Sequence, residues 1–178
     1  LKVGLLNAGT GDVALVSTSG SVLDNGNATG LGVDLTNVQA AGLGIDAFVG
    51  AGELGTGKGA LETKVETIAV KAGTGGISLL EEDAVTVGSV GVTVGQVSMA
   101  GFQGLLTYPA WSDLSTRTGT NGAIVLQTID GTITVTAGDD GGYGVSAGGS
   151  GNILLNAQDD DAAAESDLIL LAAVQSGS

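Results

Sequence analysis

The stretch that decides the fold is Ala72-Gly73-Thr74-Gly75-Gly76-Ile77-Ser78-Leu79. It places a glycine-rich corner before two aliphatic residues that lie two positions apart, which is the spacing of a β-strand with one buried face. The same pattern occurs three more times, at 8–15 (AGTGDVAL), 118–126 (TGTNGAIVL) and 147–155 (AGGSGNILL). A corner that recurs together with the strand after it predicts a repeated architecture.

A second short strand is expected after each corner. In the first three copies, the last corner glycine is followed nine residues later by a Gly or Ala that opens another aliphatic segment. These segments are 21–23 (SVL), 85–87 (VTV) and 132–135 (TITV), and the fourth copy reaches 167–170 (DLIL) after a longer turn. The pattern predicts a parallel β-solenoid with stacked coils of roughly 20 to 25 residues. The alternative is an antiparallel β-sandwich, which also has short strands and glycine-rich turns.

The composition favours a scaffold over a catalyst. The 178 residues include 33 Gly but no Cys and no His, so a Ser-His-Asp triad, a thiol nucleophile and a zinc finger are excluded. With 19 acidic residues against 5 basic ones, the net charge of −14 opposes binding to nucleic acid and to anionic membrane surfaces. No apolar run is long enough to span a membrane. We therefore predict that the protein is not an enzyme.

Residues 1–178 are expected to form one solenoid domain, or a segment of a longer one, with a lateral insertion around residues 96–116. The insertion does not fit the corner pattern, and it carries Phe102, Tyr108 and Trp111 beside the only proline. Aromatic rings stack on sugar faces and anchor interfaces, so these three are candidate binding residues for a glycan or a neighbouring subunit. The alternative interpretation is a loop that packs its own hydrophobic cluster against the side of the solenoid.

Two acidic turns are candidate calcium sites. Asp139 and Asp140 precede two glycines, and Asp159, Asp160 and Asp161 lie in the irregular turn of the fourth copy. Carboxylates and backbone carbonyls are the ligands that calcium prefers, but neither segment matches the EF-hand loop or the calcium-binding β-roll repeat. The alternative is that both are solvated turns whose charge favours solubility. No other cofactor is expected.

Three short motifs are of the kind that a glycine-rich chain produces by chance. Residues 50–55 (GAGELG) match the dinucleotide fingerprint, and 52–58 (GELGTGK) have the spacing of a phosphate-binding loop. The latter motif needs a Ser or Thr where Gly59 stands. Residues 27–29 (NAT) have the form of a glycosylation sequon. We predict no nucleotide site from these matches.

The run 57–79 (GKGALETKVETIAVKAGTGGISL), which leads into 85–88 (VTVG), resembles repeat regions of filamentous-haemagglutinin-like bacterial adhesins and related giant extracellular proteins. The resemblance covers residues 40–95 well and the other corners loosely. It implies a right-handed parallel β-helix on a cell surface or in an extracellular filament, and it brings no catalytic residues.

From the corners and this resemblance we expect a structural role as an adhesin stalk, surface fibre or self-assembling filament subunit outside the cell. Copies of the chain would associate end to end or laterally, or the chain would continue into a longer one. Two alternatives stay open, namely a glycan-binding module that uses the aromatic insertion and a β-helix enzyme that degrades polysaccharides.

Overall fold

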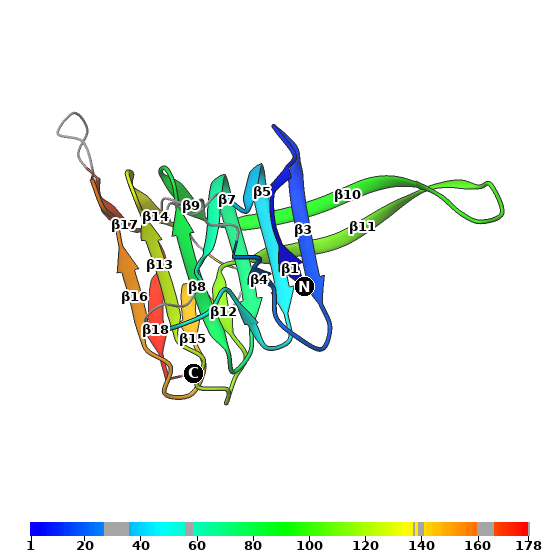
Figure 1. The fold of residues 1–178 in the computed structure, drawn as a ribbon. Helices are drawn as coiled ribbons and strands as arrows, with labels where there is room; N and C mark the ends of the chain where they lie inside the picture. Colours follow the sequence, from blue (N-terminus) through cyan, green and yellow to red (C-terminus); the bar gives the residue numbers. More distant parts are fainter. Residues whose placement is uncertain (27–35, 56–58, 137, 139–140, 160–165, 178) are drawn as a thin grey trace.

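The computed structural model describes residues 1–26, 36–55, 59–136, 138, 141–159 and 166–177, and its regular structure there is entirely β (Figure 1). The strands are β1 Lys2–Val3, β2 Leu6–Asn7, β3 Asp12–Ser17, β4 Leu23–Asp24, β5 Val38–Ala47, β6 Gly50–Ala51, β7 Leu61–Ala72, β8 Gly76–Glu81, β9 Val85–Val87, β10 Ser89–Val97, β11 Gln103–Ser112, β12 Leu114–Thr116, β13 Ile124–Thr128, β14 Ile133–Val135, β15 Tyr143–Ala147, β16 Ile153–Asn156, β17 Leu168–Leu170 and β18 Ala173–Ser176. The prediction of an all-β fold is confirmed.

Fourteen of the strands form one curled sheet, and its described pairings are parallel. The short strands β1 and β4 form a separate parallel pair. Since a sandwich of hairpins and Greek keys requires antiparallel neighbours, the alternative of an antiparallel β-sandwich is wrong. Parallel strands cannot be joined by tight hairpins, which explains why each strand meets its neighbour only after the chain has gone round the core.

The second half of the sheet consists of three triplets of strands that stack on one another. The triplet β16, β17 and β18 pairs with β13, β14 and β15, which in turn pairs with β8, β9 and β12. Equivalent aliphatic residues therefore form columns across the sheet. One column holds Leu15, Ile45, Val70, Leu114, Val145 and Val174, a second Ala51, Ile77, Ile124 and Ile153, and a third Ile68, Val87, Val135 and Leu170.

Three of the four repeated corners have equivalent places in this arrangement. The strands after the corners at Gly75, Gly122 and Gly151 are β8, β13 and β16, which pair in register. The first copy differs, because Leu15 of β3 pairs with Ile45 of β5 in another column. The expected equivalence of the first copy is therefore wrong. A glycine-rich turn followed by a half-buried strand does not specify which side of the core that strand covers.

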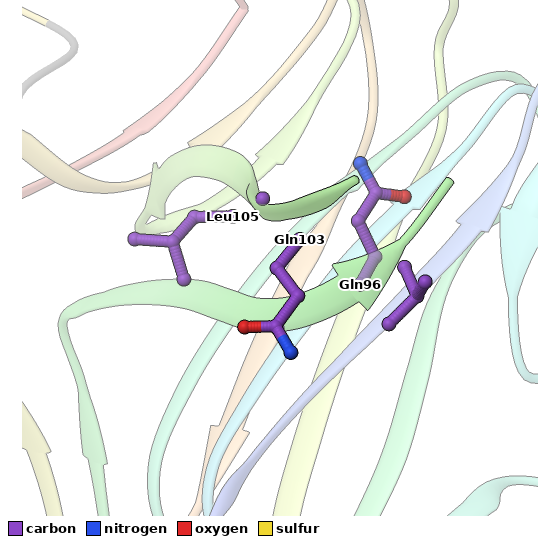
Figure 2. Close-up of a pocket in the computed structure, with 6 residues that line it drawn as sticks. Gln96, Gln103 and Leu105 are labelled. Carbon is purple, nitrogen blue, oxygen red and sulfur yellow. The ribbon is translucent and has the colours of Figure 1, made fainter. Parts of the chain in front are cut away.

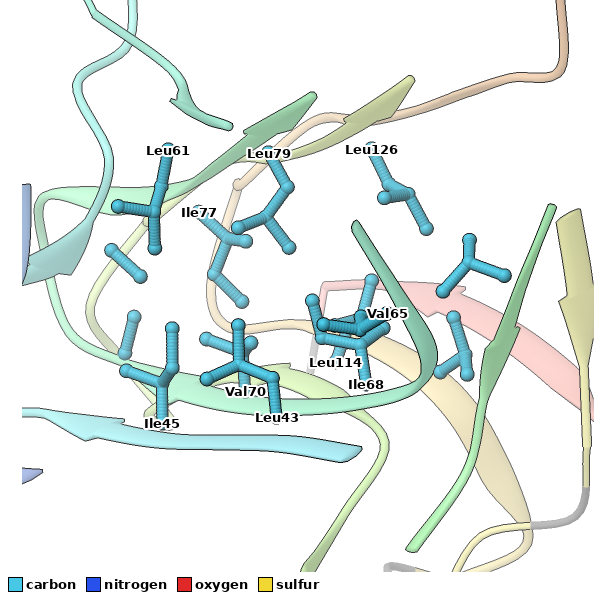
Figure 3. Close-up of a cluster of buried hydrophobic side chains, with 14 of the residues drawn as sticks. Leu43, Ile45, Leu61, Val65, Ile68, Val70, Ile77, Leu79, Leu114 and Leu126 are labelled. Carbon is cyan, nitrogen blue, oxygen red and sulfur yellow. The ribbon is translucent and has the colours of Figure 1, made fainter. Parts of the chain in front are cut away.

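The core lies between opposite sides of the curled sheet. Figure 3 shows side chains such as Leu61 and Leu79 on one side pointing toward Ile45 and Val70 on the other. These four side chains are at most 1% exposed, and burying a side chain of this size contributes about 1.5–3 kcal/mol. The core is therefore made by aliphatic residues from strands far apart in sequence.

The corners bring backbones too close together for a side chain. A Cβ atom at Gly122 would meet the carbonyl oxygen of Gly73, and one at Gly151 would meet the carbonyl oxygen of Gly122. The recurrence of glycine at these corners is therefore a steric requirement of the stacking.

An antiparallel ribbon, β10–β11, interrupts the sheet between β9 and β12. The Asp113 N–H donates to the Gly88 carbonyl at 3.1 Å, so the chain leaves the sheet and re-enters it at one point. Figure 1 shows the ribbon crossing the sheet and projecting beyond β3. The ribbon occupies residues 89–112 rather than the expected 96–116. Because of the ribbon, more residues lie between Val70 and its column partner Leu114 in the sequence than the expected length of a coil.

Candidate functional site

The ribbon is the candidate functional site because it exposes large apolar side chains in a protein of net charge −14. No Asp, Glu, Lys or Arg occurs between Ala84 and Ser112. The exposed side chains of the ribbon are Val94, Val97, Met99, Phe102, Leu105, Leu106 and Tyr108. A contiguous apolar surface of this kind commonly marks an interaction site.

The part of the ribbon nearest the sheet, which we term the root, packs on the outer face of the sheet. Val90 and Val92 are buried there with Ala69, and Ala14 and Trp111 pack against the same cluster. Strand β10 contacts β3, β5 and β7, so the root crosses three neighbouring strands. The sheet offers small residues at the crossing, which leaves room for the larger side chains of the ribbon.

Gly44 is the residue that lets the indole of Trp111 approach the sheet. It pairs with Ala14 on one side and Ala69 on the other, so three small residues lie side by side. A Cβ atom at Gly44 would overlap the Trp111 ring, at 2.9 Å from Cζ3 and closer still to Cε3. The contact fixes the ribbon against β5.

A β-bulge at Pro109 adjusts the ribbon so that its aromatic residues share a face. On either side of the bulge, Val90 pairs with Trp111 and Val92 pairs with Tyr108. Proline lacks an N–H and is tolerated in antiparallel strands mainly at edges and bulges. The Tyr108 and Trp111 rings stack with centroids 5.9 Å apart and an interplanar angle of 23°.

The outer half of the ribbon continues the same face without a surface beneath it. Residues directly opposite in an antiparallel pair share a face, and alternate residues along a strand share one too. The face that carries Val90 and Val92 therefore continues with Val94 and its partner Leu106. Val94 is 47% exposed and Leu106 is 39% exposed. The ribbon thus has one packing face, of which the root half is covered by β3, β5 and β7.

The tip of the ribbon is a tight turn. The Gly101 N–H donates to the Ser98 carbonyl at 2.8 Å, and the Ser98 N–H donates to the Phe102 carbonyl at 2.8 Å. Gly101 has φ 79°, a left-handed conformation that glycine adopts without strain. The turn leaves Phe102 at the tip, 75% exposed.

A hollow of about 450 Å³ lies on the ribbon near its tip, lined by Gly95, Gln96, Val97, Gln103, Gly104 and Leu105. Figure 2 shows Gln96, Gln103 and Leu105 around it. The lining offers apolar surface and amide groups but no ionisable side chain. Its chemistry therefore suits binding by packing and hydrogen bonds rather than acid–base catalysis.

The three aromatic candidates from the sequence occupy different parts of the ribbon. Tyr108 and Trp111 lie together at the root, whereas Phe102 lies at the tip. They do not form one aromatic platform. The sequence reasoning missed Val90, Val92 and Val94, although the valines two apart inside a long uncharged run are a signal that could have identified them.

The predicted calcium ligands are only partly described. Asp159 is exposed, whereas Asp139, Asp140, Asp160 and Asp161 lie outside the described residues, as does the sequon at 27–29. Within the described ranges, no group of three or more acidic residues is placed to hold a metal ion. The calcium site stays a prediction.

Glu81 is an ionisable residue that lies inside the core. Glu81 is fully buried, and it accepts hydrogen bonds from the Thr63 hydroxyl at 2.6 Å and from the Val65 N–H at 2.9 Å. Burial raises the pKa of Glu81 from 4.5 to about 7, against the opposing effect of these hydrogen bonds. The group therefore couples the stability of the sheet to pH.

Comparison of the chain with family models, curated proteins and solved structures gave no match. Among the residues that the structure describes, no helix has the length and hydropathy needed to cross a membrane.

Proposed function

We propose that the chain is a structural β-solenoid, a right-handed parallel β-helix that acts outside the cell as an adhesin stalk, surface fibre or self-assembling filament subunit. Support comes from the parallel triplets with aliphatic columns and from the resemblance of 57–79 and 85–88 to adhesin repeats. Parallel rows that add one upon another make a rod whose length is set by the number of rows.

The observation that carries the proposal is the open end of the core at the last triplet. Leu168, Leu170 and Val174 pair with Ile133, Val135 and Val145 in the triplet before. The three earlier residues are fully buried, whereas Leu168, Leu170 and Val174 are 43%, 50% and 37% exposed. Core positions that become exposed at the last triplet are the surface on which a further parallel row would pack.

The opposite end of the sheet presents a compatible edge. In the described part of the chain, β3 pairs only with β5, and β17 and β18 pair only with β14 and β15. Since β3 runs parallel to the column that ends in β18, placing a second copy end to end would continue parallel pairing. Such a head-to-tail contact does not close on itself and generates a filament. A continuation of the same chain would cover this end in the same way.

Sedimentation velocity of the purified chain over a wide range of concentrations tests self-association. We expect elongated species that grow with concentration, and we expect Leu170→Lys to suppress them because it places a charge on the open core. Ile129→Lys is the matched control, since Ile129 is 40% exposed at the corner after β13. A chain that stays monomeric at every concentration, or a Leu170→Lys variant that associates like the parent, would contradict the filament proposal.

A further inference from the structure

We propose that the outer half of the β10–β11 ribbon is a clamp for a second copy of this chain, packing across the outer face of that copy from β18 of its last triplet to β12. The inference rests on the proposed end-to-end association and adds to it a specific interaction surface. One continuous face of the ribbon would then pack on the sheet of its own molecule at the root and on the second copy beyond β3.

The outer half of the ribbon continues the packing face of the root. Val90 and Val92 pack on the outside of the sheet, and Val94 and Leu106 extend the same face past β3. Figure 1 shows that this outer half has no part of the described chain beneath it. A partner that covers the outer half must extend the outer face of the sheet beyond β3. The end of a second copy stacked against β3 would extend it in this way.

The outer half of the ribbon is long enough to cross several strands of a second copy. Beyond the Val92–Tyr108 pair, β10 continues for the five residues 93–97, which span roughly 17 Å at 3.4 Å per residue. Because neighbouring strands lie about 4.8 Å apart, this length crosses about three strands. On a second copy stacked against β3, those strands would be β18, β15 and β12. The ribbon would therefore end near the point where the second copy's own ribbon leaves its sheet.

The last triplet offers a small residue on this path. Ala173 precedes Val174 as Gly44 and Ala69 precede Ile45 and Val70, and a bulge pairs Ala173 with Tyr143 of β15. Ala173 is therefore a small residue where the root of the ribbon also finds small residues. Ile169 follows Thr134 in the column that begins with Asp12 and Gly42, of which Gly42 lies beside Val90 at the root.

Charge favours the same partner. Residues 168–177 contain no Asp, Glu, Lys or Arg, as is also true of the ribbon. The pairing therefore brings together two uncharged segments in a protein of net charge −14. The ribbon also lacks the cationic residues that draw proteins to anionic lipid surfaces.

Two neighbouring substitutions test the clamp. Val94→Lys places a charge on the packing face, whereas Thr93→Lys places one on the opposite face of the ribbon. We expect Val94→Lys to weaken self-association in sedimentation velocity by about tenfold or more, and Thr93→Lys to leave it nearly unchanged. Replacing residues 95–105 by Asn-Gly, which makes a two-residue turn between the paired Val94 and Leu106, should also weaken it.

Disulfide cross-linking tests the partner surface directly, because the chain has no cysteine of its own. A Val94→Cys chain is mixed with an Ile169→Cys chain under mild oxidation, and we expect a disulfide-linked heterodimer. An Ile129→Cys chain in place of the Ile169→Cys chain should give much less. Equal yields with both partners, or a main product that links two Val94→Cys chains, would overturn the clamp.

The outcomes separate the clamp from the proposed function. If the parent chain does not self-associate, the filament proposal is wrong, and the clamp that rests on it is wrong too. If the parent associates and Val94→Lys and Thr93→Lys associate equally well, the clamp alone fails. If instead the parent binds phosphatidylcholine vesicles through Val94 and does not self-associate, the ribbon is a membrane anchor and both proposals are wrong.

Discussion

The indole ring of Trp111 lies directly against Gly44, so that the ribbon is held on the outside of the sheet by a residue that has no side chain. Trp111 is the only tryptophan in the protein. Its fluorescence therefore reports on this one contact, and several consequences of the structure can be measured through it.

Gly44→Val should push the indole away from β5. The new side chain would occupy the position of the Trp111 ring, and overpacking of this kind costs about 1–3 kcal/mol. We expect a red-shifted tryptophan emission and easier quenching by acrylamide, with the far-UV circular dichroism preserved. Gly95→Val is the matched control, because a Cβ atom at Gly95 would meet no atom within 4 Å. An unchanged emission in the Gly44→Val variant would contradict the contact.

Glu81→Gln should remove a pH dependence of stability. Because the pKa of Glu81 is about 7 in the folded protein against 4.5 ordinarily, folding takes up a proton between these values. The contribution of this group to stability is therefore fully present below pH 4.5 and is lost as the pH rises to 7, by roughly 3 kcal/mol. We expect the free energy of unfolding of Glu81→Gln, measured by urea denaturation, to fall less than that of the parent between pH 4.5 and pH 8.

Glu82→Gln is the control for this pH dependence, because Glu82 is half-exposed and pairs with Lys64 at 2.8 Å instead of lying in the core. We expect it to keep the parent's fall in stability between pH 4.5 and pH 8. A Glu81→Gln variant with the same pH profile as the parent would show that Glu81 does not titrate in this range.

Gly122→Ala should strain a corner. A methyl group there would meet the carbonyl oxygen of Gly73 on the neighbouring corner, and the backbones would have to separate. We expect a loss of about 1–3 kcal/mol in the free energy of unfolding. Gly104→Ala, where the added methyl would meet no atom within 4 Å, should change stability by less than about 0.5 kcal/mol. Equal effects of the two substitutions would argue against close stacking of the corners.

Removal of the whole ribbon should leave the parallel sheet intact. The Asp113 N–H to Gly88 carbonyl hydrogen bond of 3.1 Å shows that the ends of the ribbon are adjacent, so Asn-Gly can replace residues 89–112 as a turn. We expect a cooperative thermal transition and β-type circular dichroism, together with loss of self-association. A shortened chain that does not fold would show that the ribbon belongs to the core of the protein.

The sequence allowed part of the fold to be predicted because some of its signals are local. The glycine corners before β8, β13 and β16 are repeated since stacking leaves no room for a side chain there, as at Gly122. The corner before β3 has a similar glycine-rich sequence, but its strand lies in another column of the sheet. Strand pairing depends on residues distant in sequence, so the local pattern does not specify it.

The extent of the ribbon could not be read from its sequence for a related reason. The valines of β10 alternate in the same way as those of the main sheet, and only their pairing with β11 distinguishes them. The contact between Trp111 and Gly44 also joins segments distant in sequence, so no local pattern indicates it. The aromatic residues do lie in or beside the segment that leaves the sheet as a ribbon, but the valines on the packing face are what place it against the sheet.

Negative-stain electron microscopy of the concentrated chain is the most direct test of a solenoid that stacks end to end. For the parent chain we expect unbranched rods that lengthen with concentration and keep the width of a single molecule. In the Val94→Lys and Leu170→Lys variants we expect the rods to be shorter or absent. Isolated particles of constant length, or assemblies that widen into sheets or bundles while their length stays fixed, would contradict end-to-end stacking.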